Sequence, residues 1–198
     1  MNKSDAYTFL LRCVIPEVTN KKQIPNGLKK SNLIWDCVFR AHRDVLTGRF
    51  HLKNYVNLSS DGRINNVDFR LYSLIKEYDD KNSQEFINQR ELIRTLWDEN
   101  REVGLGAIQK LVNMTFKYMV ILKIYKICEF DYIDENNCDC PLDSIILKTL
   151  PEYKTETWTS LGADESDWEK YEKIQECISK IYKNRLIYDF KYYSSFQQ

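Results

Sequence analysis

The chain has 198 residues, of which 43% are hydrophobic and 13% aromatic, and its 29 basic and 29 acidic residues give zero formal net charge. A chain of this length can bury a core large enough to fold without disulfide bonds or a structural metal ion. Its apolar and aromatic content excludes a disordered polar chain. No apolar run approaches the roughly 20 residues of a membrane span, so we expect no membrane partner. Zero net charge removes the simplest argument for nucleic-acid binding, although one local basic face would be enough for it.

The cysteines indicate a reducing compartment. Arg12 breaks a short apolar stretch near the N-terminus, so we read no signal peptide and expect a cytoplasmic protein. Four of the six cysteines lie in apolar runs, which favours buried, reduced thiols; the six are Cys13, Cys37, Cys128, Cys138, Cys140 and Cys177. A zinc site at Cys128, Cys138 and Cys140 stays an alternative, but no His follows at ligand spacing. We expect no metal and no cofactor.

Apolar residues recur at helical spacing along nearly the whole chain, which predicts one all-α domain over 1–198 with about eight helices. The first three are expected over about 6–14, 32–47 and 66–78. Two capping boxes, Asn82-x-x-Glu85 and Ser166-x-x-Glu169, predict the starts of two more. The first of these would carry Phe86 and Ile87. The aromatic tail, 186–196, is compatible with a helix or an extended segment.

The sequence Val103-Gly104-Leu105-Gly106 lies between two expected helices. Glycine allows a tight turn and a close approach to a partner. The free amides at the start of the second helix could hold a phosphate, as in a helix-hairpin-helix motif. The alternative is an ordinary turn between helices with glycine at the C-cap.

The helix that follows this turn is apolar almost all round, which is typical of a central buried helix. Lys110, Asn113 and Lys117 nevertheless fall within one 60° arc, estimated at roughly 100° per residue. This polar stripe is either a solvent-exposed edge or the floor of a functional groove. A lysine partly buried in such a groove would lose basicity and become a competent amine nucleophile.

A second informative place is Cys140-Pro141-Leu142-Asp143, which precedes another apolar helix. Asp143 or the following Ser144 is expected to cap this helix. A carboxylate held at a helix N-terminus also stays fixed in direction, and it can stabilise a developing cation or accept a proton.

These two places resemble the helix-hairpin-helix DNA glycosylases, specifically the 8-oxoguanine glycosylase branch with its single-domain, all-α members. The resemblance covers about residues 83–150 and implies two helical lobes with a groove between them. It implies that Lys110 is the nucleophile and Asp143 the carboxylate that assists it. It also implies nucleic-acid contacts along the hairpin and the helix after it, at Gly104, Leu105, Gly106, Gln109, Asn113 and Lys117.

The activity implied is the excision of a modified purine, such as 8-oxoguanine, from duplex DNA through a Schiff base on Lys110. Such an enzyme would act as both hydrolase and lyase in DNA repair. Proteins with this kind of fold also occur in bacterial antiphage operons. The first alternative is therefore an inactive glycosylase-fold protein that binds nucleic acid, a nucleotide or a partner protein in antiviral defence. A second alternative is a helical interaction protein, which predicts an exposed Lys110 with an ordinary titration.

Overall fold

A computed structural model describes residues 30–47, 66–81, 85–124 and 126–195. These residues form helices and contain no strand, which confirms the all-α prediction. The helices are α2 (Lys30–Thr47), α4 (Asn66–Asp80), α5 (Gln89–Glu99), α6 (Leu105–Ile124), α7 (Ser144–Thr149), α8 (Glu165–Ile181) and α9 (Arg185–Ser195), with the short 3-10 helices η2 (Arg101–Val103) and η3 (Trp158–Ser160). The expected helix over 6–14 lies outside the described residues.

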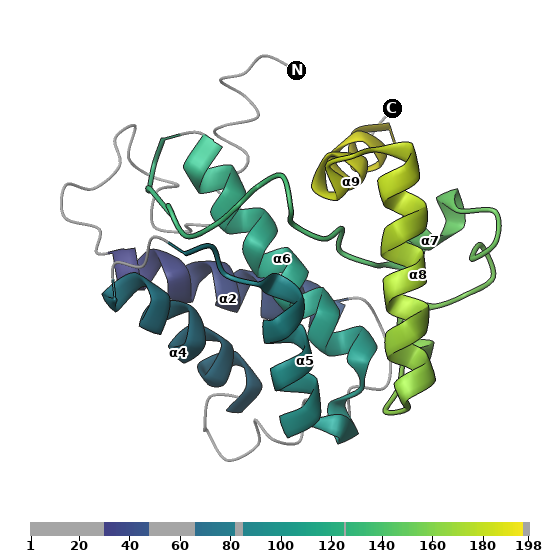
Figure 1. The fold of residues 1–198 in the computed structure, drawn as a ribbon, viewed down its shortest axis with the longest axis horizontal. Coiled ribbons are helices and arrows are strands. Elements are labelled where there is room, and N and C mark those ends of the chain that lie inside the picture. The colour runs from purple at the N-terminus through teal and green to yellow at the C-terminus, as the bar shows by residue number, and fades with distance from the viewer. Residues whose placement is uncertain (1–29, 48–65, 82–84, 125, 196–198) are drawn as a thin grey trace.

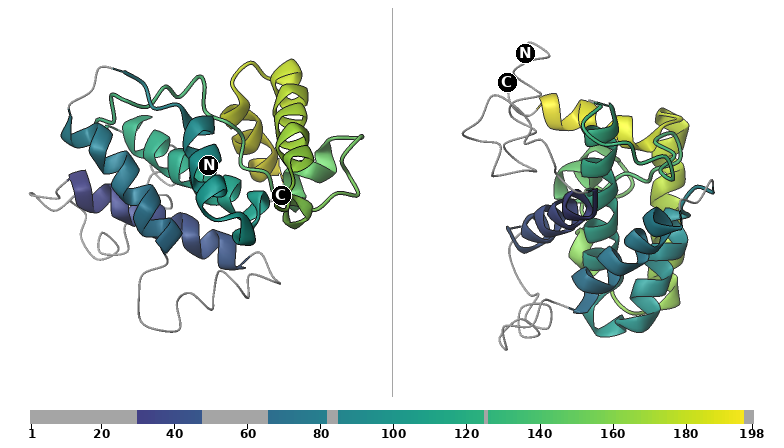
Figure 2. Two further views of the ribbon diagram at one scale, coloured as in Figure 1. Left: turned by 60° about the horizontal axis from the view of Figure 1, so that its bottom comes forward. Right: turned by 90° about the vertical axis from the view of Figure 1, so that its left-hand side faces the viewer.

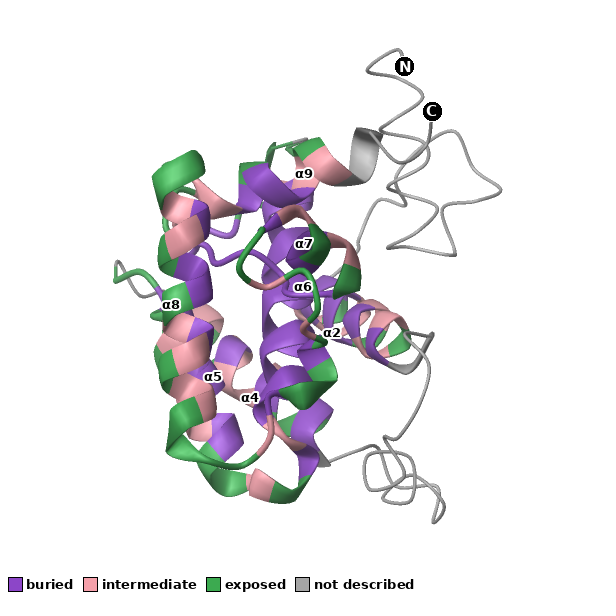
Figure 3. Ribbon diagram, turned by 90° about the vertical axis from the view of Figure 1, so that its right-hand side faces the viewer, coloured by how far each residue is buried: buried purple, intermediate pink, exposed green. Residues whose placement is uncertain are grey.

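Helix α6 lies at the centre of the fold. Helices α2 and α5 pack against α6, α4 packs against α2 and α5, and α8 and α9 lie on the other side of α6 (Figures 1 and 2). Every residue of α6 from Leu105 to Leu122 is buried (Figure 3). The apolar composition of α6 explains this position, because a helix that is apolar all round has no face suited to solvent.

The surrounding helices bury only one face each. In α8 the buried positions follow helical spacing, at Tyr171, Ile174 and Ile178, as the sequence predicts. The tail is helical rather than extended, and Tyr188 is fully buried within it. No helix in the described ranges is long and apolar enough to cross a membrane.

The structure corrects both predicted capping boxes. Helix α5 begins only at Gln89, where the Asn88 side chain accepts a hydrogen bond from Glu91 N, and Asn82 lies outside the described residues. Phe86 precedes the helix and is exposed, because it belongs to the connecting segment and not to a core-facing helical stripe. Helix α8 begins two residues earlier than expected, with Asp164 as its N-cap. The box is formed there by Asp167, whose carboxylate accepts from Asp164 N.

Five cysteines lie in the described part of the chain, and all five are free. Burial raises the pKa of the Cys138 thiol to about 12 and that of Cys128 to about 11, so both are protonated at neutral pH. Within the same residues, no cluster of His, Cys, Asp or Glu side chains is arranged to hold a metal ion.

Candidate functional site

Lys110 has a buried amine near the start of α6. The residue is only 7% exposed, and Nζ lies 4.8 Å from the centre of the Trp158 ring. Within the described part of the chain, Nζ forms no hydrogen bond or ion pair. Burial lowers the pKa of Lys110 below its ordinary value of 10.5, and the charge of Asp143 is the largest influence opposing that shift. Such an amine is more often neutral, and hence nucleophilic, than a surface lysine.

Asp143 is the N-cap of α7, which decides between the two capping residues predicted from the sequence, Asp143 and Ser144. Its Oδ1 accepts hydrogen bonds from Ile145 N at 2.8 Å and Ile146 N at 2.9 Å. These two bonds fix the direction of the carboxylate, and burial of the residue keeps it out of bulk water. Although Asp143 is 33 positions from Lys110 in the sequence, its charge is the largest influence that opposes the lowering of the Lys110 pKa by burial.

Two buried amides on α6 hold the chain just before Asp143. Gln109 Nε2 donates to Leu142 O at 3.0 Å, and Leu142 N donates back to Gln109 Oε1 at 3.2 Å. One turn later, Asn113 Nδ2 donates to Cys140 O. Because both ends of Gln109 bind the same backbone unit, the register between α6 and the 140–143 segment is fixed.

Gln109 and Asn113 were predicted to contact nucleic acid. In the structure their side-chain amides instead bind groups within the protein. Both residues are fully buried, and their polar groups are engaged within the protein. In this structure neither side chain is exposed to a ligand outside the molecule. They hold the 140–143 segment against α6.

Gly104 and Gly106 form a tight turn, as predicted, but the backbone amides of Leu105 and Gly106 donate hydrogen bonds within the protein. Gly104 adopts φ +83°, a conformation that favours glycine. Leu105 N donates to Gly162 O and Gly106 N donates to Leu161 O, both at 2.8 Å. The expected phosphate contact through these amides is absent from this arrangement, because backbone carbonyls already occupy the donors.

Gly106 has a second role that explains the place of Trp158. A β-carbon on Gly106 would lie 1.9 Å from the carbonyl oxygen of Trp158. Only glycine allows η3 to approach α6 this closely. Lys110 is one helical turn beyond Gly106, so the close approach brings the Trp158 ring next to its amine.

Lys117, two turns after Lys110, forms a buried ion pair with α9. Its Nζ lies 2.5 Å from Asp189 Oδ2, and it also lies 5.4 Å from the centre of the Phe190 ring. Burial raises the pKa of the Asp189 carboxyl above its ordinary 3.8, and the charge of Lys117 opposes this. Neither oxygen of Asp189 accepts a hydrogen bond of regular geometry from the described residues.

The polar stripe of α6 is thus not a solvent-exposed edge. Lys110, Asn113 and Lys117 are all buried, because η3, the 140–143 segment and α9 cover this face. The interpretation as an exposed, ordinary lysine on an interaction protein is wrong for Lys110. Whether a ligand-binding groove opens above this stripe stays a prediction.

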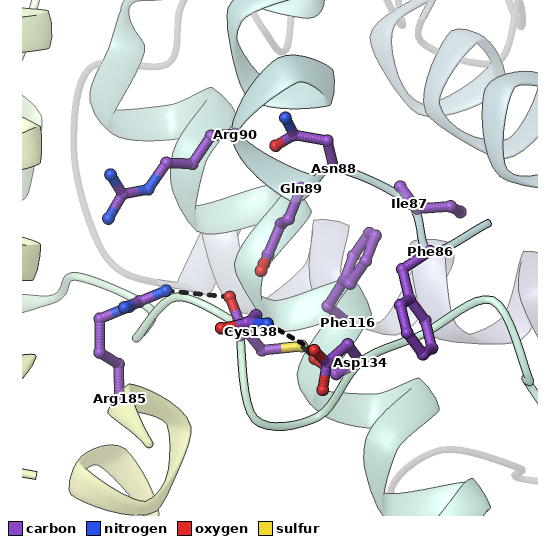
Figure 4. A pocket seen from close by; sticks show the side chains of 10 residues that line it. Phe86, Ile87, Asn88, Gln89, Arg90, Phe116, Asp134, Cys138 and Arg185 are labelled. Carbon is purple, nitrogen blue, oxygen red and sulfur yellow. Dashed lines mark hydrogen bonds between the residues drawn. The ribbon is translucent and has the colours of Figure 1, made fainter. Parts of the chain in front are cut away.

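A separate pocket of about 350 Å³ lies at the N-terminus of α5 (Figure 4). Arg90 and Arg185 line one side and Phe86 and Phe116 the other. Both guanidinium groups are engaged by the buried Asp139: Arg90 Nε donates to it at 2.8 Å, and Arg185 Nε lies 2.6 Å away. The hydroxyl of Tyr171 donates to the same carboxylate. This network ties α5, α8 and α9 together and leaves little positive charge for an anionic ligand.

No family model, curated protein or solved structure matches the chain. The site therefore has to be interpreted from its own geometry.

Three residues near Lys110 were missed in the sequence: Asp44, Trp158 and Asp189. Asp189 had a usable signal, since a single carboxylate stands between Tyr188 and Phe190 in an otherwise aromatic tail. Asp44 and Trp158 lie on amphipathic or irregular segments where a charged or aromatic residue is ordinary. Only the folded structure shows that these two residues contact residues of α6.

Proposed function

We propose that the protein is a DNA glycosylase-like enzyme that excises a modified purine, such as 8-oxoguanine, with Lys110 as nucleophile. The observation that carries this proposal is the buried amine of Lys110, which has a lowered pKa, no ion-pair partner among the described residues, and a fixed carboxylate near it. A structural lysine of a soluble domain is rarely buried without a partner, because the desolvated charge costs free energy.

The chemistry follows from these groups. Neutral Lys110 Nζ attacks C1′ of the deoxyribose, and the bond between C1′ and the base breaks, with its electron pair leaving on the base. The base takes up a proton as it leaves, and Asp143 stabilises the positive charge that develops on the sugar. Opening of the sugar ring then gives a protonated imine between Lys110 and C1′.

The Lys117–Asp189 pair suits recognition of the purine before this step. Lys117 carries N–H donors and Asp189 carries carboxylate oxygens, and both groups would have to be uncovered by a movement of α9 to contact the edge of the base. A base would have to leave the duplex to reach these groups, and such flipping is general for enzymes that act on bases. In this proposal two lobes flank the groove that receives the base.

The decisive experiment is borohydride trapping on duplex DNA that contains 8-oxoguanine or an abasic site. Borohydride reduces the imine to a stable amine, so the wild-type protein should give a covalent complex that Lys110→Gln abolishes. Lys123→Gln is the matched control, because Lys123 is on the same helix but pairs with Glu135 at its far end. An equal yield of adduct from Lys110→Gln would refute the proposal.

A second function is favoured by the occupied amides of Leu105 and Gly106. A helix-hairpin-helix protein that holds DNA needs those donors, so their use inside the chain favours an inactive member of the fold that binds a nucleotide or a protein in antiviral defence. Salt dependence distinguishes the two functions. DNA binding through phosphates weakens steeply between 50 and 200 mM salt, by several orders of magnitude for about six or more contacts. No binding to DNA at low salt would favour the second function.

A further inference from the structure

The pocket at the N-terminus of α5 is lined by segments that are far apart in the sequence (Figure 4). They are residues 86–90, Phe116 of α6, the loop 134–138 and Arg185 at the start of α9. Its volume of about 350 Å³ lies within the range of small-molecule sites. None of the lining residues is among the described groups that contact Lys110 or shift its pKa, so this pocket is separate from the proposed site of reaction.

The floor of the pocket is already fixed by contacts within the protein. Gln89 is buried, its Nε2 donates to Asn113 Oδ1 at 2.7 Å, and its Oε1 accepts from Asp139 N at 2.9 Å. Phe116 is also buried. A ligand that enters this pocket therefore meets a preformed surface, which lowers the entropy cost of binding.

One side of the pocket offers aromatic surface. Phe86 is 58% exposed, although it is large and apolar, and it lies on the same side of the pocket as Phe116 (Figure 4). An exposed ring at the rim can cover one face of a flat ligand, and any nucleobase has a face that stacks favourably on an aromatic ring. The ligand class that fits this side is therefore planar and aromatic.

The other side offers hydrogen-bond donors without a surplus of positive charge. Arg90 donates to Asp139 through Nε and Nη2, and its Nη1 lies 3.8 Å from Glu172. Arg185 donates to Asn137 O through Nη2, and its Nε lies 2.6 Å from Asp139. No described residue accepts a hydrogen bond from Nη1 of either arginine. Because Asp139 and Glu172 balance the two guanidinium charges, these donors suit a neutral acceptor better than a phosphate.

Asp134 adds acceptors to the same pocket. Its Oδ1 accepts from Asn136 N at 3.0 Å and its Oδ2 accepts from Asn137 Nδ2. A carboxylate has about four acceptor positions, so about two remain for a ligand. Guanine carries the matching groups on one flat ring: N7 and O6 accept hydrogen bonds from arginine, and its ring N–H and amino group donate. Adenine has neither the carbonyl oxygen nor the ring N–H.

We propose that this pocket binds guanine, either as a free nucleoside or as a base in a nucleic-acid strand. Phe86 stacks on the ring, the Nη1 groups of Arg90 and Arg185 donate to N7 and O6, and Asp134 accepts from the N–H groups. The site goes beyond the proposed reaction and does not depend on it, since it shares no residue with the surroundings of Lys110.

The test is equilibrium dialysis of the full chain against radiolabelled guanosine. Guanosine should bind, and adenosine should compete about tenfold more weakly, because it cannot form the same pair with arginine. Phe86→Ala should weaken guanosine binding by about fivefold or more, the lower end of the effect of removing a stacked ring. Phe69→Ala is the matched control, because Phe69 is 54% exposed on α4 and lies outside the pocket; it should leave binding unchanged.

A second variant tests the carboxylate. Asp134→Asn retains an oxygen that can accept from Asn136 N, so the loop should keep its conformation. Inosine is guanosine without the amino group, and the wild-type protein should prefer guanosine over inosine. Asp134→Asn should reduce this preference, because the acceptor of the amino group has lost its charge.

The inference is overturned if guanosine does not bind at its solubility limit, if adenosine competes equally well, or if Phe86→Ala binds guanosine as tightly as the wild type. Where guanosine binds as expected, a single-stranded thymine oligonucleotide with one central guanine is added as competitor. Displacement of guanosine identifies a base in a strand as the ligand, and retention of guanosine identifies the free nucleoside. Both results agree with a guanine site, and neither depends on the outcome of borohydride trapping.

Discussion

The backbone carbonyl of Trp158 packs directly against Gly106, at a position where a β-carbon would lie 1.9 Å from its oxygen. This contact allows the amide of Gly106 to reach Leu161 O and brings the Trp158 ring to Lys110. Because the obstructing atom belongs to the backbone, rotation of a side chain cannot relieve the clash. The contact therefore links the stability of the helical turn with the environment of the amine.

Gly106→Ala should consequently be strongly destabilising. Separating η3 from α6 costs packing and two backbone hydrogen bonds, so we expect a loss of about 3 kcal/mol in the free energy of unfolding. Chemical denaturation measures it. Gly162→Ala is the control, because its β-carbon would meet only Asp167 Oδ2 at an ordinary 3.4 Å. Similar losses for the two variants would show that the close approach is unimportant.

Asp143 has a capping role and a charge, and two substitutions separate them. Asp143→Ala removes both acceptor contacts to Ile145 and Ile146, and we expect a loss of about 1–2 kcal/mol in stability. Asp143→Asn retains an oxygen that can cap, so its stability should stay within about 0.5 kcal/mol of the wild type.

The same Asn variant removes the charge that raises the pKa of Lys110. The pKa of Lys110 should therefore fall further below 10.5 in Asp143→Asn, measured by NMR titration of ¹³C-dimethylated lysines. An unchanged Lys110 titration in this variant would mean that the two groups are not electrostatically coupled.

Lys110→Met should stabilise the fold, by about 1 kcal/mol at neutral pH, because it replaces a buried amine with an apolar side chain of similar length. The size of this gain depends on pH. The folded-state pKa of Lys110 is lowered, so burying the ammonium costs most below that pKa, and the cost disappears as the pH rises toward 10.5. The stability advantage of Lys110→Met should shrink over the same range.

Thermal denaturation of both proteins at several pH values between neutral and 10.5 tests this. Lys123→Met is the control, since Lys123 is partly exposed and bonded to Glu135 and Ile133 O, and it should not stabilise. A lower melting temperature for Lys110→Met at neutral pH would indicate that the amine contributes to stability and is not held for chemistry.

Asp139 joins three helices, and its removal should be severe. Asp139→Ala leaves the guanidinium groups of Arg90 and Arg185 without their shared carboxylate, and we expect a loss of about 3–5 kcal/mol. Glu172→Gln is the control, because Glu172 lies 3.8 Å from Arg90 on the surface and should matter by less than about 0.5 kcal/mol. Urea unfolding of both variants makes the comparison, and equal midpoints would contradict it.

The sequence predicted correctly a feature that depends only on neighbouring residues, the start of the helix after Asp143. Asp143 follows a proline turn and precedes an apolar run, and a carboxylate in that place caps a helix without help from distant residues. The same local rule placed the two capping boxes wrongly, because more than one position fits it. Several Asn, Asp and Ser residues lie near each helix start, so the pattern alone does not select Asn88 or Asp164 as the N-cap.

Periodicity could not tell whether the polar stripe of α6 faces solvent. Lys110, Asn113 and Lys117 have the spacing of an exposed edge, but the covering elements come from positions 140–143, 158–162 and 185–190. Asp44 lies 66 positions before Lys110, and no local rule relates them.

The sequence alone determined that the protein is all-α, that the 105–124 helix is central, and that a helix begins just after Asp143, because helical periodicity and capping act over a few residues. Only the tertiary structure decided that the hairpin amides are occupied, that Gln109 and Asn113 hold the 140–143 segment, and that the amine of Lys110 is buried under the Trp158 ring. These features depend on which distant segments pack against α6. Burial then changes both the hydrogen-bonding partners and the free energy of each charge.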